Sequence, residues 1–587
     1  MDDAPSNLFT FIHISDIHVS RFHKAGGRAH LAHFLRHTLR RHGPAFVVAT
    51  GDLTDAKDQA QMGGRQDEGE WQAYRGLLQR AGVLDRRNGD FWRDLRGNHD
   101  CFSVPTWTSP ANHFPQYSAS GKAAWSAVED MGFGQYGFIA VDGCPDRGAT
   151  RMLNFFGLLP RPAMTTLARQ VDELAPITNH TFFLSHYPAS TTRYAHAQDG
   201  RTFGDLAAKG ISLGLCGHLH RLAGGLGDRL QAYHAAGDWL ELELPDLKLT
   251  SSYRVIAVDH DMISYTDNQL FPLGQPLLVD RTLEEDRDGK EKEIKLSKGA
   301  DSGYSEPPVV LITNPKEASL ILPHKEPIWR IQKSTHIRAL VWPGEGRRIV
   351  RVMAHIPGKE PVEMHYSGKG SQESWEKEDG EGYLPLWTVA WNPKELGPMD
   401  RVHSLLIRAE DDTGVVGEGS VEFRVDGARE PLDAGWLSHW VIHANFDKVI
   451  PLAFLSIYLP IMILLLLARC SLPSQNPQGF VSLRGRELKV AWSSSPSSFF
   501  NALYMAPRIY WHRAQAIACT PKFFLPIFVY GLLLPIAPWY GGDIFAGQGP
   551  QRAWVYLMGA WVEGRWVPVL DTWAQGWVGL ALSWVPV

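Results

Sequence analysis

Two carboxylates, one amide and four histidines in the first 220 residues lie in short motifs that could hold metal ions. In chain order the motifs are Asp16-Ile-His18, Gly51-Asp52, Gly97-Asn98-His99-Asp100, Ser185-His186 and Gly217-His218-Leu-His220. Carboxylate, amide and imidazole ligands together suit Mn, Zn or Fe rather than Ca. One such motif alone is usually just a turn, whereas the ordered set of five predicts a site for two divalent ions.

Each motif directly follows a short apolar run that is rich in β-branched and aromatic residues. These runs predict strands at Leu8–Ile14, Ala45–Thr50, Phe91–Leu95, Thr181–Leu184 and Ile211–Cys216. Apolar residues at helical spacing predict helices at Gly27–Arg41 and Glu70–Arg80. Strands that alternate with helices indicate an α/β layered fold, in which ligands collect at the carboxyl ends of the strands. We therefore expect the motifs to meet in one crevice.

The motifs and their order resemble the calcineurin-like metallophosphoesterase superfamily over residues 8 to about 270. The resemblance implies a sandwich of β-sheets flanked by helices, with two divalent metal ions (Mn, Zn or Fe) as cofactors. The implied ligands are Asp16, His18 and His220 for the first ion, Asn98, His186 and His218 for the second, and Asp52 as the bridge. It also implies that His99 stabilises the transition state or protonates the leaving oxygen, and that Asp100 orients His99.

The chemistry of such a centre explains why these residue types are needed. Two metal ions about 3.5–4 Å apart hold the attacking and leaving oxygens, and they lower the pKa of water from about 15.7 towards 7. The expected function is therefore hydrolysis of a phosphate mono- or diester through a metal-bridging hydroxide. Phosphomonoesters, phosphodiesters and lipid phosphates all remain open as substrates. The alternative is a catalytically silent membrane receptor or scaffold that keeps the metal-bearing domain for binding.

The chain of 587 residues is too long for one core, and its composition changes near residue 280. We predict a phosphoesterase domain over 1–280, a mobile charged linker over 281–307, an all-β immunoglobulin-like sandwich over 308–427 and a membrane region over 428–587. The sandwich is predicted from short alternating runs divided by turn signals. Its strands are expected at Val309–Thr313, Thr335–Trp342, Ile349–His355, Leu384–Trp391, Val402–Ala409 and Ser420–Val425.

The membrane region is predicted from long runs without charge. Val449–Ala468 contains twenty uncharged residues, enough to cross about 30 Å of hydrocarbon as a helix. Phe523–Tyr540 is a second candidate helical span, and the tryptophan-rich residues 553–587 offer further candidates. Membrane lipid is therefore an expected partner.

The loop between the two predicted spans carries most of the topological signal. Its basic residues are Arg469, Arg484, Arg486, Lys489, Arg508, Arg513 and Lys522, against the single acid Glu487. By the positive-inside rule this loop is cytosolic, so the phosphoesterase domain is expected on the lumenal or extracellular side. Residues 1–20 show no signal peptide, which favours the opposite orientation. We give the charge bias more weight, because charge near a span sets orientation physically.

Net charge and cysteine content exclude other classes of function. A net charge of −5 argues against nucleic acid as a binding partner. The five cysteines are odd in number and unclustered, so the sequence implies neither a disulfide framework nor a zinc site built from thiolates. We expect them to be small buried packing residues.

Overall fold

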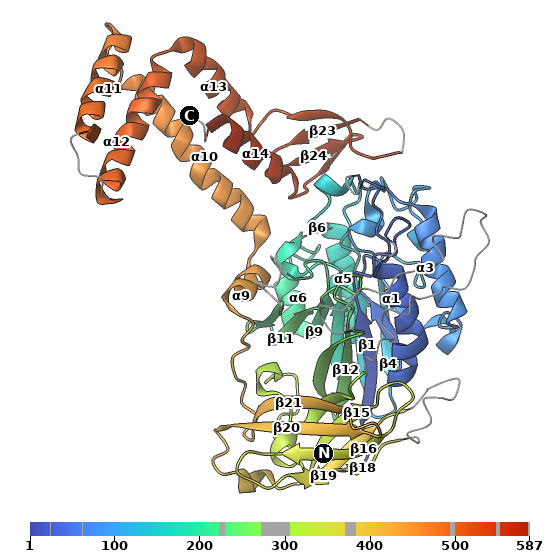
Figure 1. The fold of residues 1–587 in the computed structure, drawn as a ribbon. Coiled ribbons are helices and arrows are strands. Elements are labelled where there is room, and N and C mark those ends of the chain that lie inside the picture. The colour runs from blue at the N-terminus through green and yellow to red at the C-terminus, as the bar shows by residue number, and fades with distance from the viewer. Residues whose placement is uncertain are drawn as a thin grey trace. The chain divides into compact units, whose positions relative to one another are not determined.

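The computed structural model describes residues 1–23, 25–60, 63–221, 229–271, 306–369, 383–493, 499–547 and 552–584 (Figure 1). The chain divides into two compact units, which are described separately. The first unit comprises Met1–Arg151, Phe156–Ala444 and Phe545–Gly547, and the second comprises Met152–Phe155, Asn445–Ile544 and Gln548–Val587. The predicted linker 281–307 lies outside the described residues except for its last two positions.

Two mixed β-sheets form the core of the phosphoesterase part of the first unit. The five-stranded sheet has the order β13 (Met262–Gln269), β12 (Ser252–Asp259), β1 (Leu8–Ile14), β2 (Val47–Ala49) and β3 (Trp92–Asp94). The six-stranded sheet has the order β10 (Gln231–His234), β11 (Trp239–Glu243), β9 (Ile211–Cys216), β7 (His180–Leu184), β5 (Gln135–Ala140) and β4 (Trp125–Asp130). Phe11 of the first sheet meets Phe138 and Phe182 of the second edge to face, so the sheets pack face to face.

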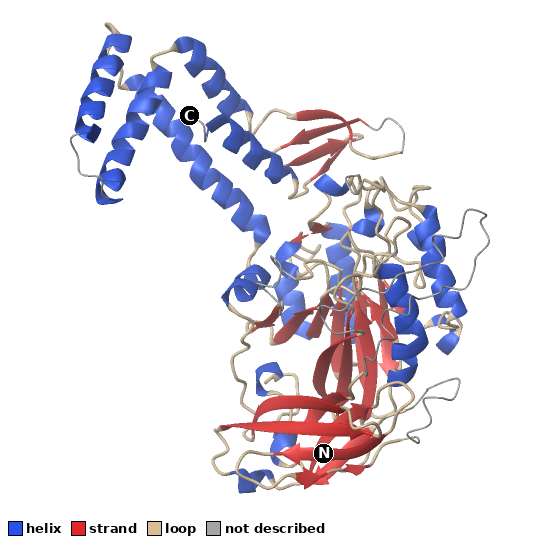
Figure 2. Cartoon of the chain, in the orientation of Figure 1, coloured by secondary structure: helices blue, strands red, loops and turns tan. Residues whose placement is uncertain are grey.

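Helices cover the outer faces of both sheets (Figure 2). On the first sheet lie α1 (Gly27–His33), a π-helical turn (Phe34–Thr38), α2 (Leu39–His42) and α3 (Glu68–Arg80). On the second sheet lie α5 (Arg161–Leu174) and α6 (Phe203–Gly210). The N-terminus of α6 is stabilised by a capping box, in which the side chains of Thr202 and Asp205 each accept a hydrogen bond from the other's backbone N–H. The expected helices at Gly27–Arg41 and Glu70–Arg80 are therefore present, the first with a π-helical turn inside it.

The immunoglobulin-like part of the first unit is a sandwich of two four-stranded sheets. One has the order β14 (Val309–Asn314), β15 (His336–Trp342), β19 (Leu386–Ala390) and β18 (His365–Tyr366). The other has the order β17 (Val362–Glu363), β16 (Ile349–His355), β20 (Val402–Asp411) and β21 (Val416–Arg424). All six strands predicted from alternation occur, with end points shifted by at most a few residues, because one face of each is packed into a shared core.

A buried ion pair joins the sandwich to the phosphoesterase sheets. Arg338 of β15 donates to both carboxylate oxygens of Asp259 of β12, at 2.8 and 3.0 Å, and both side chains are fully buried. Burial alone would raise the pKa of Asp259, but the charge and hydrogen bonds of Arg338 and His260 hold that pKa well below its usual range. Trp342 also packs in the phosphoesterase core. The two domains are therefore parts of one compact unit.

We expect Arg338→Met to lower the free energy of unfolding by about 3–5 kcal/mol, because it leaves the buried Asp259 charge without its partner. Since the pKa of folded Asp259 is depressed, the loss should be complete above the unfolded pKa of about 3.9 and should shrink as the pH falls below it. Thermal unfolding of the purified chain measures the change. The control Arg408→Met breaks a half-exposed pair with Glu418 and should cost less than about 1 kcal/mol. Equal losses in the two variants would contradict this role.

The second unit contains one helix that is long and apolar enough to cross a membrane. Helix α10 (Phe446–Cys470) has 25 residues and a mean hydropathy of 2.6 over its best window. It includes the predicted span 449–468. Three helices follow it: α11 (Pro477–Ser493), α12 (Phe499–Ala518) and α13 (Pro521–Leu533). Within the described residues, Leu503–Ala518 and Pro521–Leu533 are long and apolar enough to cross a membrane only when taken together, and the chain bends by 103° between them.

The second predicted span differs from the structure. Helix α13 ends at Leu533, and strand β22 (Tyr540–Asp543) begins within the range 523–540. Pro535 and Pro538 account for the early end, because proline lacks the N–H that continues a helix and its ring clashes with the preceding turn. The structure therefore shows a helix over only the first part of 523–540, and a second membrane span there stays a prediction.

The tryptophan-rich residues after 552 also differ from the expected helical spans. They form β23 (Arg552–Tyr556), β24 (Gly559–Val562) and β25 (Arg565–Val567), which pair with β22 in an antiparallel sheet. Glu563 and Gly564 both have positive φ, which suits a two-residue hairpin turn. Tryptophans at 554, 561 and 566 are exposed, and alternate residues are buried. Only α14 (Thr572–Trp584) is helical in this part of the described chain, and its 13 residues are fewer than a span needs.

Candidate metal centre

The five motifs lie at the carboxyl ends of five strands. Asp16 and His18 follow β1, Asp52 follows β2, and Asn98 and His99 follow β3. His186 follows β7, and His218 and His220 follow β9 in the second sheet. Strands β1 to β3 are parallel, as are β7 and β9, so their ends meet at one edge of the sandwich. This topology places the distant motifs together.

Four side chains gather where the first metal ion is expected. Nε2 of His220 lies 2.7 Å from Oδ1 of Asp16, and Nε2 of His18 lies 3.8 Å from the same oxygen. Nε2 of His18 is also 3.6 Å from Oδ2 of Asp52. Nε2 of His18 is buried and has no hydrogen-bond partner among the described residues, which suits a nitrogen that binds a metal.

Three more side chains gather on the other side of Asp52. Oδ1 of Asn98 lies 3.2 Å from Nε2 of His186 and 3.2 Å from Nδ1 of His218. Nε2 of His186 lies 3.4 Å from Oδ1 of Asp52. The two oxygens of Asp52 thus face different histidines, His18 and His186, as a bridging carboxylate requires. All seven predicted ligands lie in one cluster, and their assignment to two ions stays a prediction.

Neighbouring acceptors orient the histidine rings. The carbonyl of Thr50 accepts from Nδ1 of His186 at 2.8 Å. The proton therefore stays on Nδ1, and the lone pair of Nε2 points toward Asn98. Oδ1 of Asp55 lies 3.3 Å from Nδ1 of His18. Oδ2 of Asp246 lies 3.5 Å from Nδ1 of His220. Carboxylates and carbonyls behind metal-binding histidines fix the tautomer and ring orientation in this way.

The backbone at the centre is held in sparsely populated conformations. Five of the predicted ligands have φ between 51° and 85°: Asp16, His18, Asp52, His218 and His220. Such conformations are unfavourable for non-glycine residues and cluster at functional sites. Glycine is required beside them, because a Cβ on Gly217 would lie 2.1 Å from Oδ2 of Asp16. A Cβ on Gly97 would lie 2.1 Å from Oδ1 of Asp52.

The cluster carries more buried negative charge than its own cations neutralise. Burial raises the pKa of Asp52 well above its usual value, and the charges of Asp16 and Asp100 raise it further. Burial also lowers the pKa of His218 and His186, which favours their neutral, metal-binding form. Buried carboxylates beside neutral imidazoles suit divalent cations. The chemistry of the residues therefore fits the metal ions that the resemblance implies.

His99 and Asp100 do not interact as predicted. The carbonyl of Asp55, and not Asp100, accepts from Nδ1 of His99 at 2.6 Å. The Asp100 carboxylate instead accepts from the backbone N–H groups of Leu53, Thr54 and Gly97, at 2.9–3.0 Å. Asp100 therefore fixes the loops that carry Asp52 and Asn98, so the predicted orienting contact to His99 was wrong. Nε2 of His99 faces Oδ2 of Asp52 at 3.8 Å.

A buried carboxylate with two lysines was not recognised from the sequence. Oδ1 of Asp55 lies 2.7 Å from Nζ of Lys248 and 3.4 Å from Nζ of Lys57. Burial would raise the pKa of Asp55, but the hydrogen bond and charge of His18 and the two lysine charges hold it far below its usual value. Asp55 and Lys57 lie in the segment after β2 that carries Asp52, so they could have been considered from the sequence. No sequence pattern indicates that Lys248 lies near Asp55. Asp55 thus contacts both histidines: its carboxylate lies beside Nδ1 of His18, and its backbone carbonyl accepts from Nδ1 of His99.

A disulfide bond joins Cys101, two residues after His99, to Cys144. The expectation that all five cysteines are simple packing residues was therefore wrong. Their separation of 43 residues hid the pairing, since spacing alone does not bring two sulfurs together. Cys216, Cys470 and Cys519 are free. The disulfide ties the loop that carries Asn98 and His99 to the segment after β5.

Comparison with protein-family models gives two matches that agree with these features. Residues 9–222 match the family described as calcineurin-like phosphoesterase, and residues 304–429 match the TMEM62 Ig-like domain. The chain therefore contains a calcineurin-like phosphoesterase domain and a TMEM62-type immunoglobulin-like domain. The resemblance seen in the motifs is confirmed.

Two individual relatives are similar to this chain over 70% and 95% of its length. The chain is 33% identical to transmembrane protein 62 of Mus musculus over 411 residues, which cover 70% of this chain and 54% of the mouse protein. It is 21% identical to a metallophosphoesterase-type protein of Arabidopsis thaliana, over 95% of this chain and 74% of that protein. The NAD nucleotidase of Haemophilus influenzae aligns with 50% of this chain and 55% of its own, at 13% identity and a TM-score of 0.29, which is too low to support an argument. The chain thus spans about half the length of the mouse relative.

We expect Gly217→Ala to reduce the metal content of the calcineurin-like phosphoesterase domain strongly. The added Cβ would lie 2.0 Å from Oγ of Ser15 and 2.1 Å from Oδ2 of Asp16, so the segment that carries the predicted ligand Asp16 would have to move. Elemental analysis of the purified chain measures metal per protein. Gly204→Ala is the control, because its Cβ would meet only Oγ1 of Thr202, at 3.7 Å, near the start of α6. Undiminished metal content in Gly217→Ala would show that Asp16 is not a ligand.

Proposed function

We propose that the chain is a membrane-anchored phosphoesterase that depends on two divalent metal ions (Mn, Zn or Fe) and hydrolyses a phosphate mono- or diester. The observation that carries the proposal is the gathering of the seven predicted ligands in one cluster, in which the two oxygens of Asp52 face different histidines. Asp16, His18, Asp52 and His220 would hold one ion, and Asn98, His186, His218 and Asp52 the other. Two such ions supply positive charge to the phosphoryl oxygens and make water more acidic.

His99 is the residue best placed to move a proton. A carbonyl only accepts hydrogen bonds, so the contact with Asp55 keeps a proton on Nδ1 of His99. Nε2 is left facing the Asp52 side of the centre, where His99 could take up a second proton as imidazolium and give it to the leaving oxygen. Gln66 donates to the carbonyl of His99 and holds its backbone from the other side, at 2.8 Å. His99 thus works beside the ligands without belonging to the seven.

We expect His99→Gln to reduce phosphoester hydrolysis by about 10²–10⁴-fold while the metal content stays unchanged, because a positioned proton donor contributes about that much. Turnover of an aryl phosphate and an aryl phosphodiester by the purified full chain, with elemental analysis in parallel, measures both quantities. His196→Gln, on an exposed side chain, is the control.

Three outcomes separate the explanations. Activity that is lost only in His99→Gln supports the enzyme and its proton donor. Full activity in His99→Gln would assign the proton transfer to another group. A chain that binds two metal ions but hydrolyses no mono-, di- or lipid phosphate would identify the alternative, a receptor or scaffold that keeps the metal-bearing domain for binding.

We further propose that the phosphoesterase domain lies on the lumenal or extracellular side. The basic residues after α10 favour a cytosolic position for α11 and α12. The disulfide between Cys101 and Cys144 supports the same orientation independently, because disulfides persist in oxidising compartments and are rare in the cytosol.

Cysteine alkylation of the full chain from intact cells tests this orientation. After denaturation without a reductant, a thiol reagent should label three cysteines per chain, which are Cys216, Cys470 and Cys519. After reduction it should label all five. Labelling of five cysteines before reduction would place the domain in a reducing compartment. In sealed microsomes the phosphoesterase domain should also resist added protease while the 470–522 segment is cut.

A further inference from the structure

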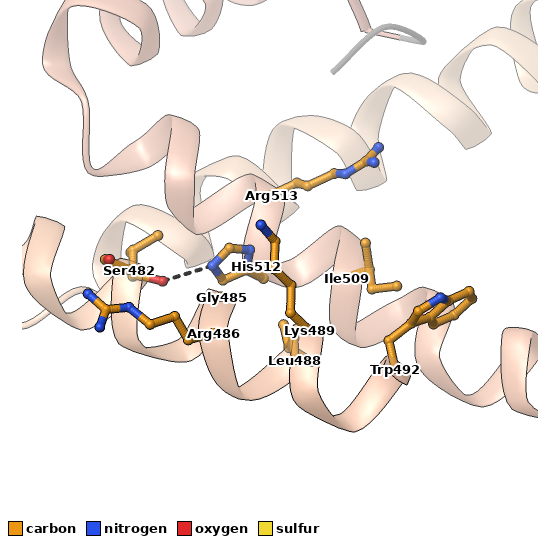
Figure 3. Close-up of a pocket in the computed structure, with 10 residues that line it drawn as sticks. Ser482, Gly485, Arg486, Leu488, Lys489, Trp492, Ile509, His512 and Arg513 are labelled. Carbon is orange, nitrogen blue, oxygen red and sulfur yellow. Dashed lines mark hydrogen bonds between the residues drawn. The ribbon is translucent and has the colours of Figure 1, made fainter. Parts of the chain in front are cut away.

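Helices α11 and α12 of the second unit enclose a cavity of about 600 Å³ (Figure 3). The helices are tied together at its floor, where the ring of His512 bonds the carbonyl of Val481 at 2.8 Å. Gly485 allows this close approach, because a Cβ there would lie 2.9 Å from Nε2 of His512. The cavity is therefore held open by a defined helix pair.

The charged residues that line the cavity are all basic. Arg486 and Lys489 come from α11 and Arg513 from α12, and none of the described residues that line the cavity is acidic. Within the described part of the chain, these three side chains form no ion pair. Arg484 differs from them, because it hydrogen-bonds Gln515 at 3.4 Å and stacks on Phe480. Three cations without an internal partner around one cavity indicate an anionic ligand.

Apolar side chains line the cavity beside Ser482 and His512, and further apolar side chains on α11 are exposed. Leu488, Trp492 and Ile509 line the cavity, and Trp492 is 51% exposed. Leu483 and Val490 on α11 are 60% and 65% exposed. Soluble surfaces seldom leave so many apolar side chains open beside one basic cluster. The ligand should therefore combine a negative head with an apolar body.

Helix α12 is fixed to the end of the candidate span α10. Arg469, at the last turn of α10, donates to the carbonyl of Ala518 at 3.0 Å. Gln515 of α12 donates to Ser471, just after α10, at 2.9 Å. The cavity thus belongs to the helices at the end of the span, where a chain leaves the hydrocarbon and meets the phosphate groups of the lipids.

We infer that this cavity binds one anionic phospholipid. Its phosphate headgroup would be held by Arg486, Lys489 and Arg513, and its acyl chains would lie along the apolar side chains of α11 and α12. Basic pockets beside membrane helices bind anionic headgroups in this way. This site is separate in the chain from the metal centre, and it needs neither the metal ions nor hydrolysis.

Lipid binding to the full chain in detergent tests the inference. The chain is given equal amounts of phosphatidylserine and phosphatidylcholine, and retained lipid is counted by native mass spectrometry. EDTA is present throughout, so the result does not depend on whether the metal centre is active. We expect a clear excess of bound phosphatidylserine, with one molecule retained per chain.

A charge-matched pair of variants locates the site. Lys489→Gln with Arg513→Gln should weaken phosphatidylserine binding about 30-fold, since each basic group near a lipid surface is worth about fivefold in affinity. Arg508→Gln with Lys522→Gln removes the same charge outside the cavity, where Arg508 bonds Tyr504, and should leave binding unchanged. Lys489→Arg with Arg513→Lys keeps the charge and should retain binding, which separates loss of charge from loss of fold.

Three results would overturn the inference. Equal weakening in the two glutamine pairs would indicate a diffuse surface charge and no site. Loss of binding in the charge-conserving pair would indicate a structural role for these side chains. Displacement of the lipid by inorganic phosphate at millimolar concentration would show that the cavity recognises a small anion and not a phospholipid.

Discussion

The accumulation of buried carboxylates at one edge of the sandwich is the constraint on which the site depends. Asp16, Asp52 and Asp100 are almost fully buried within one cluster, and an ionised carboxylate in such a place is costly without compensation. Backbone N–H groups satisfy Asp100, and His220 faces Asp16, whereas Asp52 accepts one backbone hydrogen bond, from His99, and its pKa stays raised by burial and by the charges of Asp16 and Asp100. This arrangement suits a bound cation, as the proposed function requires. The strained ligand backbones and the glycines beside them follow from bringing these groups so close.

The same principle, a buried charge with a defined partner, joins the two domains of the first unit. Asp259 lies on β12, next to β1, and Arg338 reaches it from the immunoglobulin-like sandwich. His260 and Thr313 add two further hydrogen bonds to this carboxylate, at 2.7 and 2.6 Å. Because both charged groups of the pair have hydrogen-bond partners, the pair fixes the immunoglobulin-like sandwich against the five-stranded sheet. Asp16 and His18 directly follow strand β1 of that sheet. The sandwich therefore supports the framework of the metal centre.

The sequence was most informative where chemistry and secondary structure coincide. Strands β1 and β9 have the predicted bounds, because an apolar run stops at a metal-binding motif in each. The sequence could not predict contacts between distant segments, such as Lys248 with Asp55 or Cys101 with Cys144, since no local pattern encodes them. The apolar residues after 552 were misinterpreted because only their overall hydropathy was considered and not its periodicity. Exposed tryptophans alternate there with buried residues, which is the two-residue period of a strand.

The chain combines two regions of opposite charge that could both meet phosphate. In the first unit the carboxylate-rich centre would repel a phosphate ester unless bound metal ions reversed its charge, so the proposed phosphate binding there would depend on metal. In the second unit Arg486, Lys489 and Arg513 are cationic by themselves, so binding there must be independent of metal and sensitive to salt. Removal of the metal ions therefore separates the two sites chemically. A phosphate-bearing lipid retained by the metal-free chain would be bound by the helices after α10 and not by the phosphoesterase domain.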